Sequence, residues 1–381
     1  MKVVIVNTLS IPSGQASVNR ILSLGRGLVE NGDSVTILSS GAGVDSEEHK
    51  INGVCYRNLG AKKSVKSLFV SLLKILRKIW SNSASIDIVW VESNSPLLIL
   101  PLYLLCTVRG KKIILEKSEF PFVLMKKGLL AKLWGKIYVN TLYKCFDGMI
   151  IMTEPLLQYF KPLVRKKCKL IKCPMTVDMS RFEAVSLHNE YGEYAAYCGN
   201  MSGNKDGVEN LIEAFSYVEK KHPDFKLVMV GGTDSEKEFA RIKDKVQTLG
   251  LKNVIFTGRV DRDAIPGILT NARMLCLARP SSLQSTGGFP TKLGEYLSTG
   301  HPVVVTAVGD IPSFLDRTNS YIVAPDNNEA FGEAMNEILD DYEKASQIGV
   351  NGRQVALENF NYKVQGERLH NFMVDLKTNS K

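Results

Sequence analysis

The stretch "GGFPTKLGEYLSTGHPVV", residues 287–304, combines a glycine pair, a proline, a lysine, a glutamate and an apolar run. The glycines permit unusual backbone angles and a close approach of the backbone to a ligand. Pro290 suits the first turn of a helix, apolar residues then follow with helical spacing, and Gly300 stands where a helix end favours glycine. The stretch therefore predicts a loop, a short helix and a buried strand, which together form one unit of an α/β fold.

The start of this helix also predicts an anion site. A loop that leads into a helix N-terminus leaves free N–H groups and a partial positive charge, both of which suit a phosphate. Lys292 adds a full charge, and Glu295 shares its helix face, where a carboxylate can accept hydrogen bonds from two neighbouring hydroxyls. Phosphate and diol together describe a nucleotide, although a surface ion pair between the two side chains is the alternative. The other candidate contacts here are Gly288, Phe289, Pro290 and Thr291.

A second stretch, "YAAYCGNMSGNKDGVENLIEAF" at residues 194–215, predicts a strand, a polar glycine loop and an amphipathic helix. Lys205 lies in the loop, at the expected carboxyl end of the strand; a solvated surface lysine is the alternative. The loop lacks both G-x-G-x-x-G and G-x-x-x-x-G-K-[ST], so it supports neither a Rossmann NAD site nor a P-loop.

Short β-branched runs alternate with segments of helical period along the whole chain, which predicts parallel sheets buried on both faces. The pattern restarts near residue 194, after a segment of little periodicity, and 381 residues exceed what one core usually supports. We therefore expect an α/β fold with two doubly wound, Rossmann-like parallel-sheet domains facing across a cleft. The expected boundaries are 1–185 and 190–360, with a closing helix at 361–376 to which packing on the first domain is open.

Charge and cysteine usage narrow the partners and the compartment. Residues 1–190 carry 27 Lys and Arg against 14 Asp and Glu, whereas residues 191–381 carry 21 against 25. A basic half indicates an anionic partner. The seven cysteines lack C-x-x-C spacing and fit reduced thiols of a cytosolic protein. The uncharged run at 96–108 is shorter than the roughly 20 residues that span a bilayer, so we expect a soluble or peripheral protein.

Four segments of the C-terminal half occur in the order of a known family. They are GNMSGNKDGVENLIEAF (199–215), LVMVGGTDSEKEF (227–239), NVIFTGRVDRDAIPGIL (253–269) and GGFPTKLGEYLSTGHPVVVT (287–306). With them, residues 194–325 resemble the nucleotide-sugar domain of retaining family 4 glycosyltransferases of GT-B fold. These are group 1 type enzymes that include bacterial enzymes of surface polysaccharide synthesis, such as capsule and O-antigen. The N-terminal half resembles the family in layout alone.

The resemblance implies roles for particular residues, and two positions depart from it. Lys205 matches the family lysine, but Asn200 replaces the family arginine. Of the Glu-x7-Glu pair, the first position is Gly287, and Glu295 alone remains, as the carboxylate that would hold the ribose. We hypothesise that Lys292 supplies part of the missing arginine's charge.

The third segment implies a base-binding site. In the family, the backbone at Arg259 and Val260 contacts the nucleotide base. The following "DRD" resembles a D-x-D metal motif, but Asp261 or Asp263 is expected to cap the next helix instead. We therefore expect no metal and no cofactor, with the nucleoside-diphosphate sugar as substrate.

The implied activity is retaining transfer of a sugar from a nucleoside diphosphate to a lipid-linked or polysaccharide acceptor. Lys205, Lys292 and the helix start would stabilise the leaving diphosphate. By analogy the acceptor binds the N-terminal domain, where Gly14 would bring a loop close to the sugar and Glu119 would lie near the reacting sugar. A plain turn and a surface carboxylate are the alternatives for these two residues.

Two basic, acid-free segments with apolar stripes predict contact with an anionic membrane surface. They are Lys62–Trp80 and Lys126–Lys144. Packing of both stripes on the sheet, with the lysines extended to solvent, is the alternative. Aromatic residues are not interleaved with the basic ones as in a stacking platform, so we expect no nucleic-acid partner. The expected location is the cytoplasm, at the inner face of the plasma membrane.

Two other functions stay open at this point. A sugar-nucleotide 2-epimerase of the same fold would use the same nucleotide site without an acceptor. A non-catalytic nucleotide-sugar-binding subunit would explain the departures at Asn200 and Gly287.

Overall fold

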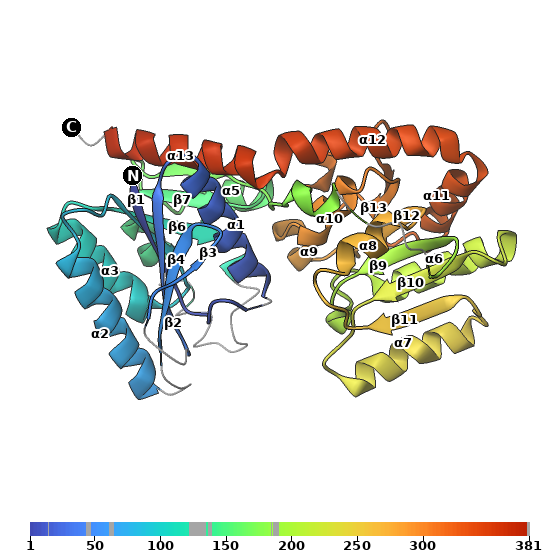
Figure 1. The fold of residues 1–381 in the computed structure, drawn as a ribbon, viewed down its shortest axis with the longest axis horizontal. Coiled ribbons are helices and arrows are strands. Elements are labelled where there is room, and N and C mark those ends of the chain that lie inside the picture. Colours follow the sequence, from blue (N-terminus) through green and yellow to red (C-terminus); the bar gives the residue numbers. More distant parts are fainter. Residues whose placement is uncertain are drawn as a thin grey trace. The chain divides into compact units, whose positions relative to one another are not determined.

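The computed structural model divides the chain into two compact units (Figure 1). The N-terminal unit contains Met1–Thr176 and Tyr362–Lys381, and the C-terminal unit contains Val177–Asn361. The structure describes residues 1–13, 15–42, 47–60, 65–121, 135, 139–183, 185 and 190–378. The chain thus passes between the units at Thr176–Val177 and again at Asn361–Tyr362, where the sequence suggested 185–190 and 360–361.

The N-terminal unit is built on an eight-stranded sheet of order β3-β4-β2-β1-β5-β6-β7-β8, which is parallel except for the pair β3–β4. Its strands are β1 (Lys2–Asn7), β2 (Ser34–Ala42), β3 (His49–Ile51), β4 (Val54–Gly60), β5 (Ile88–Glu92), β6 (Lys112–Lys117), β7 (Gly148–Ile151) and β8 (Lys169–Lys172). The strand order reverses direction between β1 and β5. The loops that leave the carboxyl ends of these strands therefore diverge, and such a switch point is where open α/β sheets bind ligands.

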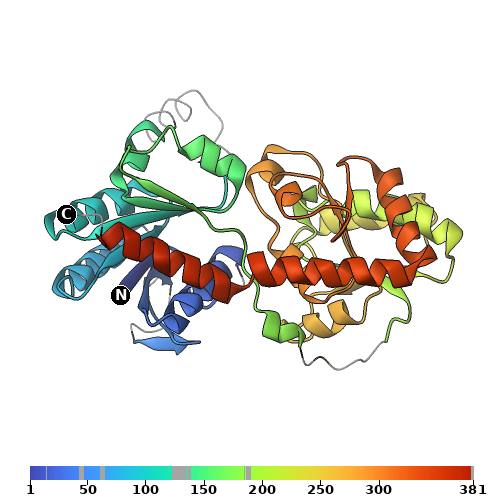
Figure 2. The ribbon, with the colours of Figure 1, turned by 90° about the horizontal axis from the view of Figure 1, so that it is seen from above.

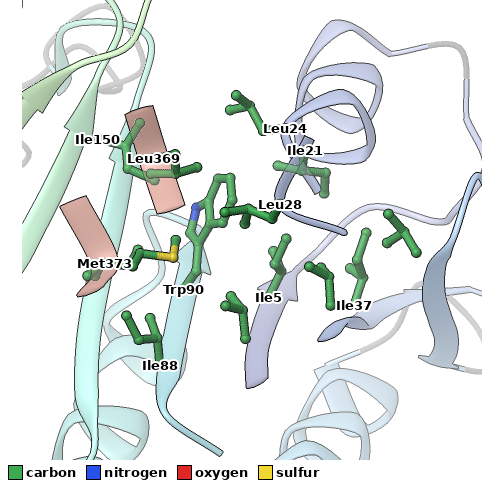
Figure 3. Close-up of a cluster of buried hydrophobic side chains, with 14 of the residues drawn as sticks. Ile5, Ile21, Leu24, Leu28, Ile37, Ile88, Trp90, Ile150, Leu369 and Met373 are labelled. Atoms are coloured by element: carbon green, nitrogen blue, oxygen red, sulfur yellow. The ribbon is translucent and has the colours of Figure 1, made fainter. Parts of the chain in front are cut away.

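Helices cover both faces of this sheet. They are α1 (Ala16–Glu30), α2 (Val65–Ser81), α3 (Pro96–Val108), α5 (Glu154–Phe160) and α13 (Tyr362–Thr378), with a short 3-10 helix, η2, at Tyr143–Cys145. Figure 3 shows the core, in which Trp90 of β5 lies between Leu24 of α1 and Met373 of α13. Trp90 is fully buried, so helices from opposite ends of the sequence share one hydrophobic cluster.

Close packing joins the last helix to the first. Figure 2 shows α13 along the N-terminal unit beside α1. A Cβ atom added to Gly366 would lie 2.5 Å from the Cα of Gly27, so the two helices can approach only because both positions are glycine. The helix suggested at 361–376 therefore belongs to the N-terminal unit.

The C-terminal unit has a six-stranded parallel sheet of order β11-β10-β9-β12-β13-β14. Its strands are β9 (Tyr194–Cys198), β10 (Lys226–Val230), β11 (Val254–Gly258), β12 (Met274–Leu277), β13 (Val303–Thr306) and β14 (Tyr321–Val323). Each central strand is a continuous buried apolar run, as expected for a sheet covered on both faces. Here the order reverses between β9 and β12, so the loops after these two strands form the switch point.

The helices of this unit are α6 (Val208–Lys221), α7 (Glu236–Thr248), α8 (Ile265–Thr270), α9 (Leu283–Gly287), α10 (Thr291–Ser298), α11 (Asn328–Asp340) and α12 (Tyr342–Asn359). Short 3-10 helices lie at η3 (Met179–Phe182), η4 (Ser202–Asn204) and η5 (Ile311–Ser313). The two doubly wound parallel-sheet domains predicted from the sequence are confirmed. In the part of the chain that the structure describes, no helix has the length and apolarity needed to cross a bilayer. The seven cysteines are free thiols.

Candidate functional site

The two stretches singled out in the sequence meet at the switch point of the C-terminal sheet. One is the loop 199–207 after β9, and the other is the segment 278–290 after β12. Gly207 has φ +70°, and a Cβ atom there would lie 1.7 Å from the carbonyl oxygen of Ala278. The loop can therefore approach the second segment only with glycine at this position.

The side chain of Arg279 bridges the two segments. It is 1% exposed, and Nε lies 3.5 Å from the carbonyl oxygen of Lys205. Nη1 lies 3.5 Å from the carbonyl oxygen of Gly288, and Nε is also 3.5 Å from the carboxylate of Asp206. The lysine loop and the start of the helix segment thus converge on one buried guanidinium. Sequence reasoning missed Arg279; the available signal was a charged residue directly after a fully apolar strand.

Lys292 does not pair with Glu295, so the surface ion pair considered for these two residues is wrong. Its Nζ forms an ion pair with Asp206 and donates a hydrogen bond to the hydroxyl of Tyr197 at 3.1 Å. Burial favours the neutral forms, but the ion pair outweighs it and lowers the pKa of Asp206 while raising the pKa of Lys292. Both groups are therefore charged at neutral pH, and the charge of Lys292 is matched inside the protein by a carboxylate that the sequence analysis did not consider.

Glu295 is paired with a different cation. Nη1 of Arg181, on η3, lies 2.7 Å from Oε1 of Glu295, and Nη2 donates to the carbonyl oxygen of Arg262 at 2.8 Å. Arg181 therefore holds the carboxylate next to the segment that follows β11. The side chains of Arg181 and Glu295 are 20% and 28% exposed, so the carboxylate remains reachable.

Lys205 and Asn200 have separate parts in the β9 loop. The side chain of Lys205 is exposed. Asn200 shapes the loop, because its Oδ1 accepts a hydrogen bond from the amide of Ser202 at 2.7 Å and its carbonyl accepts one from Tyr197 at 2.8 Å. The residue that replaces the family arginine therefore has a local structural role.

The glycine loop expected at 287–288 is wrong. Residues Leu283–Gly287 form α9, which Ser282 caps through a reciprocal pair of hydrogen bonds with Ser285. Gly287 ends this helix and Gly288 is extended with φ −94°, so neither uses the left-handed region that glycine permits. The overlooked signal was Ser282. A serine followed three residues later by another serine can cap the N-terminus of a helix through reciprocal hydrogen bonds.

The rest of the predicted contact segment lies at the start of α10. Pro290 is the N-cap, with ψ 115°, and not a first-turn residue; Thr291 begins the helix. The side chain of Phe289 is buried against Phe314 and Phe360, with ring centroids 5.6 and 5.4 Å away. Phe289 can therefore contact a ligand only through its backbone.

The segment after β11 corrects one prediction and leaves another untested. Arg259 is exposed and forms an ion pair with Asp234, while Val260 is half-buried. The cap predicted at Asp261 or Asp263 is wrong, because Ala264 is the N-cap of α8 and no side chain caps it. Across the described ranges, no group of three or more His, Cys, Asp or Glu side chains could hold a metal ion.

In the N-terminal unit, Glu119 lines a small polar cavity at the carboxyl ends of β5 and β6. The other lining residues are Glu92, Ser93, Asn94, Glu116, Lys117 and Ser118. Behind the cavity, Arg20 of α1 forms a buried ion pair with Glu116 and donates to the carbonyl oxygen of Cys173 at 2.6 Å. The second carboxylate oxygen of Glu116 is buried without a hydrogen-bond partner. Such an atom calls for a donor from a ligand or a water.

Two lining residues are driven toward their neutral forms. Burial and the like charge of Glu116 raise the pKa of Glu92 to about 8. Burial lowers the pKa of Lys117 to about 8, and its ammonium donates to the side chain of Asn94. Sequence reasoning named only Glu119 here, although "VWVES" and "LEKSE" place the other acidic residues at the same strand ends.

Some predicted residues fall outside the described ranges. They are Gly14, Lys62, Lys63 and, within Lys126–Lys144, all but 135 and 139–144. Within the segment Lys62–Trp80, the described residues belong to α2, with Leu72, Ile75 and Ile79 buried and Phe69, Leu73 and Trp80 exposed.

Comparison with known proteins supports the assignment that the fold and these loops suggest. Over its whole length the chain superposes on sucrose-phosphate synthase from Thermosynechococcus elongatus with a TM-score of 0.77, at 18% identity and with 100% of both chains covered. The superposition on Anabaena Alr3699/HepE in complex with UDP has a TM-score of 0.75 at 14% identity, with 98% of this chain and 100% of that chain covered. These similarities show the GT-B fold.

A comparison with family models finds a match in the C-terminal unit. Residues 178–355 match the family model "Glycosyl transferases group 1". The match covers slightly less than half of the chain and lies in its C-terminal unit, which is therefore similar to the group 1 glycosyltransferases.

Two curated relatives illustrate the match. A stretch of 209 residues is 29% identical to the GDP-mannose-dependent alpha-(1-6)-phosphatidylinositol monomannoside mannosyltransferase of Mycolicibacterium smegmatis, over 51% of this chain and 54% of the relative. Another of 132 residues is 33% identical to the O-antigen chain mannosyltransferase C of Escherichia coli, over 34% of this chain and 33% of the relative. The matched region therefore spans about half the length of the curated relatives, or less.

Proposed function

We propose that this chain is a retaining, metal-independent hexosyltransferase. It would transfer a sugar from a nucleoside-diphosphate sugar to a lipid-linked or polysaccharide acceptor in cell-envelope glycan synthesis. The observation that carries the proposal is the convergence of the β9 loop and the segment after β12 on Arg279. This convergence brings the backbone at Lys205 and Gly288 to one buried side chain at the switch point of the sheet.

The charge at this place suits a leaving diphosphate. Three cations, Lys205, Arg279 and Lys292, lie close enough to Asp206 to lower the pKa of its carboxyl. When the bond to the anomeric carbon breaks, negative charge grows on the diphosphate, and fixed cations and backbone N–H groups lower the energy of that state. We assign the contact with the diphosphate to the exposed side chain of Lys205 and to the start of α10, while Lys292 acts through the field that it shares with Asp206.

The carboxylate of Glu295 fits the ribose of the donor. A carboxylate has about four acceptor positions, and Arg181 takes part of one oxygen. Two neighbouring hydroxyls can use the rest. Arg181 also contacts the carbonyl of Arg262, so the ribose position would be tied to the segment at Arg259 and Val260 that we propose for the base.

The acceptor would bind the N-terminal unit at the cavity lined by Glu119. A neutral Glu92 and the unpartnered oxygen of Glu116 suit hydroxyl groups, which both donate and accept hydrogen bonds. The relative from Mycolicibacterium smegmatis, which is named for a phosphatidylinositol mannoside, supports a lipid-linked acceptor. A cytoplasmic enzyme held at an anionic membrane surface would meet such an acceptor.

The activity test uses purified protein, a panel of nucleoside-diphosphate sugars and membrane lipid extract. GDP-mannose comes first, because the relative from Mycolicibacterium smegmatis is named as dependent on it. We expect release of the nucleoside diphosphate only when lipid is present, and a product whose anomeric configuration matches the donor by NMR. An inverted product would refute the retaining mechanism.

Two alternatives give different results in the same assay. Epimer formation without lipid would identify a sugar-nucleotide 2-epimerase. Saturable binding of the donor without turnover would identify a non-catalytic subunit, which Asn200 and Gly287 first suggested.

A further inference from the structure

Large apolar side chains are exposed together on α2 and α3. Each is 47–70% exposed, and they are Phe69, Val70, Leu73 and Trp80 on α2 and Leu97, Leu100, Leu104 and Val108 on α3. Single exposed apolar residues are ordinary, but a continuous group on neighbouring elements marks an interaction site. We call these eight residues the α2–α3 face.

The two helices lie side by side, as both views in Figures 1 and 2 show. The guanidinium of Arg109, just after α3, lies 3.6 Å from the ring centroid of Trp80 near the end of α2. Other residues of the same helices serve the core: Ile75 and Ile79 of α2 and Ile99 and Leu102 of α3 are fully buried. The α2–α3 face is therefore additional to the residues that hold the helices on the sheet.

The charges carried by the two helices and by the residues that follow α3 all have one sign. α2 presents Lys74, Arg77 and Lys78, α3 has no charged residue, and Arg109 and Lys111 follow it. No acidic residue occurs within either helix. Two helices that combine exposed apolar side chains with basic residues alone complement a bilayer whose headgroups are anionic and whose interior is apolar.

The dimensions of α3 favour a position within the membrane interface. Its 13 residues correspond to about 20 Å of helix, which is less than the ~30 Å of a bilayer's hydrocarbon core. Trp80 adds an amphipathic ring of the kind that occupies the headgroup level. Lying flat, the two helices can bury their apolar side chains while the lysines and arginines reach phosphate groups.

We propose that the α2–α3 face inserts into the interfacial layer of an anionic bilayer and holds the protein there. The proposal rests on the proposed function, because a lipid-linked acceptor would lie in that bilayer. It also gives α3 a role that the sequence analysis did not assign, since the segments expected at the membrane were Lys62–Trp80 and Lys126–Lys144. Insertion of apolar side chains, and not charge attraction alone, is its distinctive claim.

The test measures partition of the full chain onto vesicles by co-sedimentation. We expect binding to vesicles of mixed phosphatidylcholine and phosphatidylglycerol, and little to phosphatidylcholine alone. The double variant Leu97→Ser/Leu104→Ser should partition at least about tenfold more weakly, because each loses an exposed apolar side chain from the inserted face. Lys74→Glu/Arg77→Glu should abolish the preference for the anionic lipid.

A matched control separates this effect from a general loss of surface apolarity. Val350→Ser/Leu249→Ser removes two exposed apolar residues of the C-terminal unit and should leave partition unchanged. If the Leu97→Ser/Leu104→Ser variant partitions like the wild type, the face does not insert. If light scattering shows a dimer that this variant dissociates, and vesicles are not bound, the face is an interface between copies of the chain.

The outcome can be separated from that of the proposed function. With a lipid acceptor dispersed in detergent, the α2–α3 variants should keep wild-type turnover, and they should lose it only when the acceptor is in vesicles. Vesicle binding by a wild-type protein that turns over no donor would refute the glycosyl transfer and leave the membrane face standing.

Discussion

The carboxyl edges of the two sheets shift the pKa values of their buried ionisable groups in opposite directions. At the edge of the C-terminal sheet, Lys292 and Asp206 form an ion pair that keeps both groups ionised. At the edge of the N-terminal sheet, Glu92 and Lys117 have pKa values shifted toward the neutral form, to about 8 in each case. Burial is the largest influence on all four groups, so burial alone does not decide the state of a site.

The charged groups next to each buried side chain decide the direction of its pKa shift. Asp206 has Lys292 in contact and Arg279 at 3.5 Å, and these cations outweigh the cost of removing the carboxylate from water. Glu92 instead has the like charge of Glu116 nearby, which adds to that cost. One edge therefore has fixed charges ready for an anionic ligand, and the other has a carboxyl group, Glu92, that is mostly protonated at neutral pH and suits hydroxyls. This division matches a diphosphate donor on one unit and a sugar or lipid-sugar acceptor on the other.

The largest effect should come from removing the exposed cation of the charged edge. Lys205→Ala should lower kcat by on the order of 10²–10³-fold, because a fixed charge that stabilises the leaving diphosphate is lost. Steady-state release of nucleoside diphosphate measures it. Lys237→Ala, on the exposed surface of α7, is the matched control and should behave as the wild type. Equal rates in the two variants would remove Lys205 from the mechanism.

The ion pair is tested by a double-mutant cycle. Lys292→Met should lower the free energy of unfolding by about 3 kcal/mol, because Asp206 is left buried without its partner. Adding Asp206→Asn should restore part of that stability, since no unpaired carboxylate remains. Turnover should stay low in the double variant, because the positive field is not rebuilt.

Denaturant unfolding and the turnover assay read the two quantities separately. If stability and turnover recover together, the pair serves the fold alone and Lys292 has no part in catalysis.

Two glycines of the loop after β9 that have nearly the same φ angle test the contact of this loop with the segment after β12. Gly207 and Gly203 have φ +70° and +69° in one loop, but only Gly207 is against another segment; nothing lies within 4 Å of a Cβ at Gly203. Both alanine variants bear the strain of a left-handed residue. Gly207→Ala should lose about 1–3 kcal/mol more, because its methyl group would overlap the carbonyl of Ala278. Equal losses in thermal unfolding would show that the segments do not depend on this contact.

The fold was predictable because its signals are local and periodic. Apolar strand runs such as "YAAYC" and "MLCL", each followed by a helix with an apolar stripe, specify a parallel sheet without knowledge of the contacts. The positions of Lys205 and Glu295 followed from the same reasoning, since a residue just after a strand or just inside a helix lies at the sheet edge. The hydrophobic pattern and the sheet topology together determine where such residues lie.

The partners of these residues were not predictable, because they depend on side chains brought together from distant parts of the chain. An ion pair of Lys292 with Glu295, three residues away, was the alternative that the sequence offered, yet the structure pairs Lys292 with Asp206 and Glu295 with Arg181. Helical spacing makes the local pair geometrically possible. In a buried site, however, the favoured partner is the one whose contacts also satisfy the polar groups around it. The same holds for Arg279 and for the pair of Arg20 with Glu116, which no sequence period reveals.

The smallest expected effect concerns Glu92, at the carboxyl edge of the N-terminal sheet. Glu92 binds its proton more tightly in the folded chain, with a pKa of about 8 against an ordinary 4.5, so its contribution to stability is full below pH 4.5 and is lost as pH rises toward 8. Glu92→Gln cannot ionise and escapes this loss. The variant should therefore gain stability relative to the wild type between pH 5 and pH 8, by on the order of 1 kcal/mol or more, measured by urea unfolding at each pH. Glu236→Gln on α7 removes the same charge from an exposed surface and should show no such trend. A difference that stays flat across this range would mean that Glu92 is ionised at neutral pH, and the two sheet edges would then no longer differ in kind.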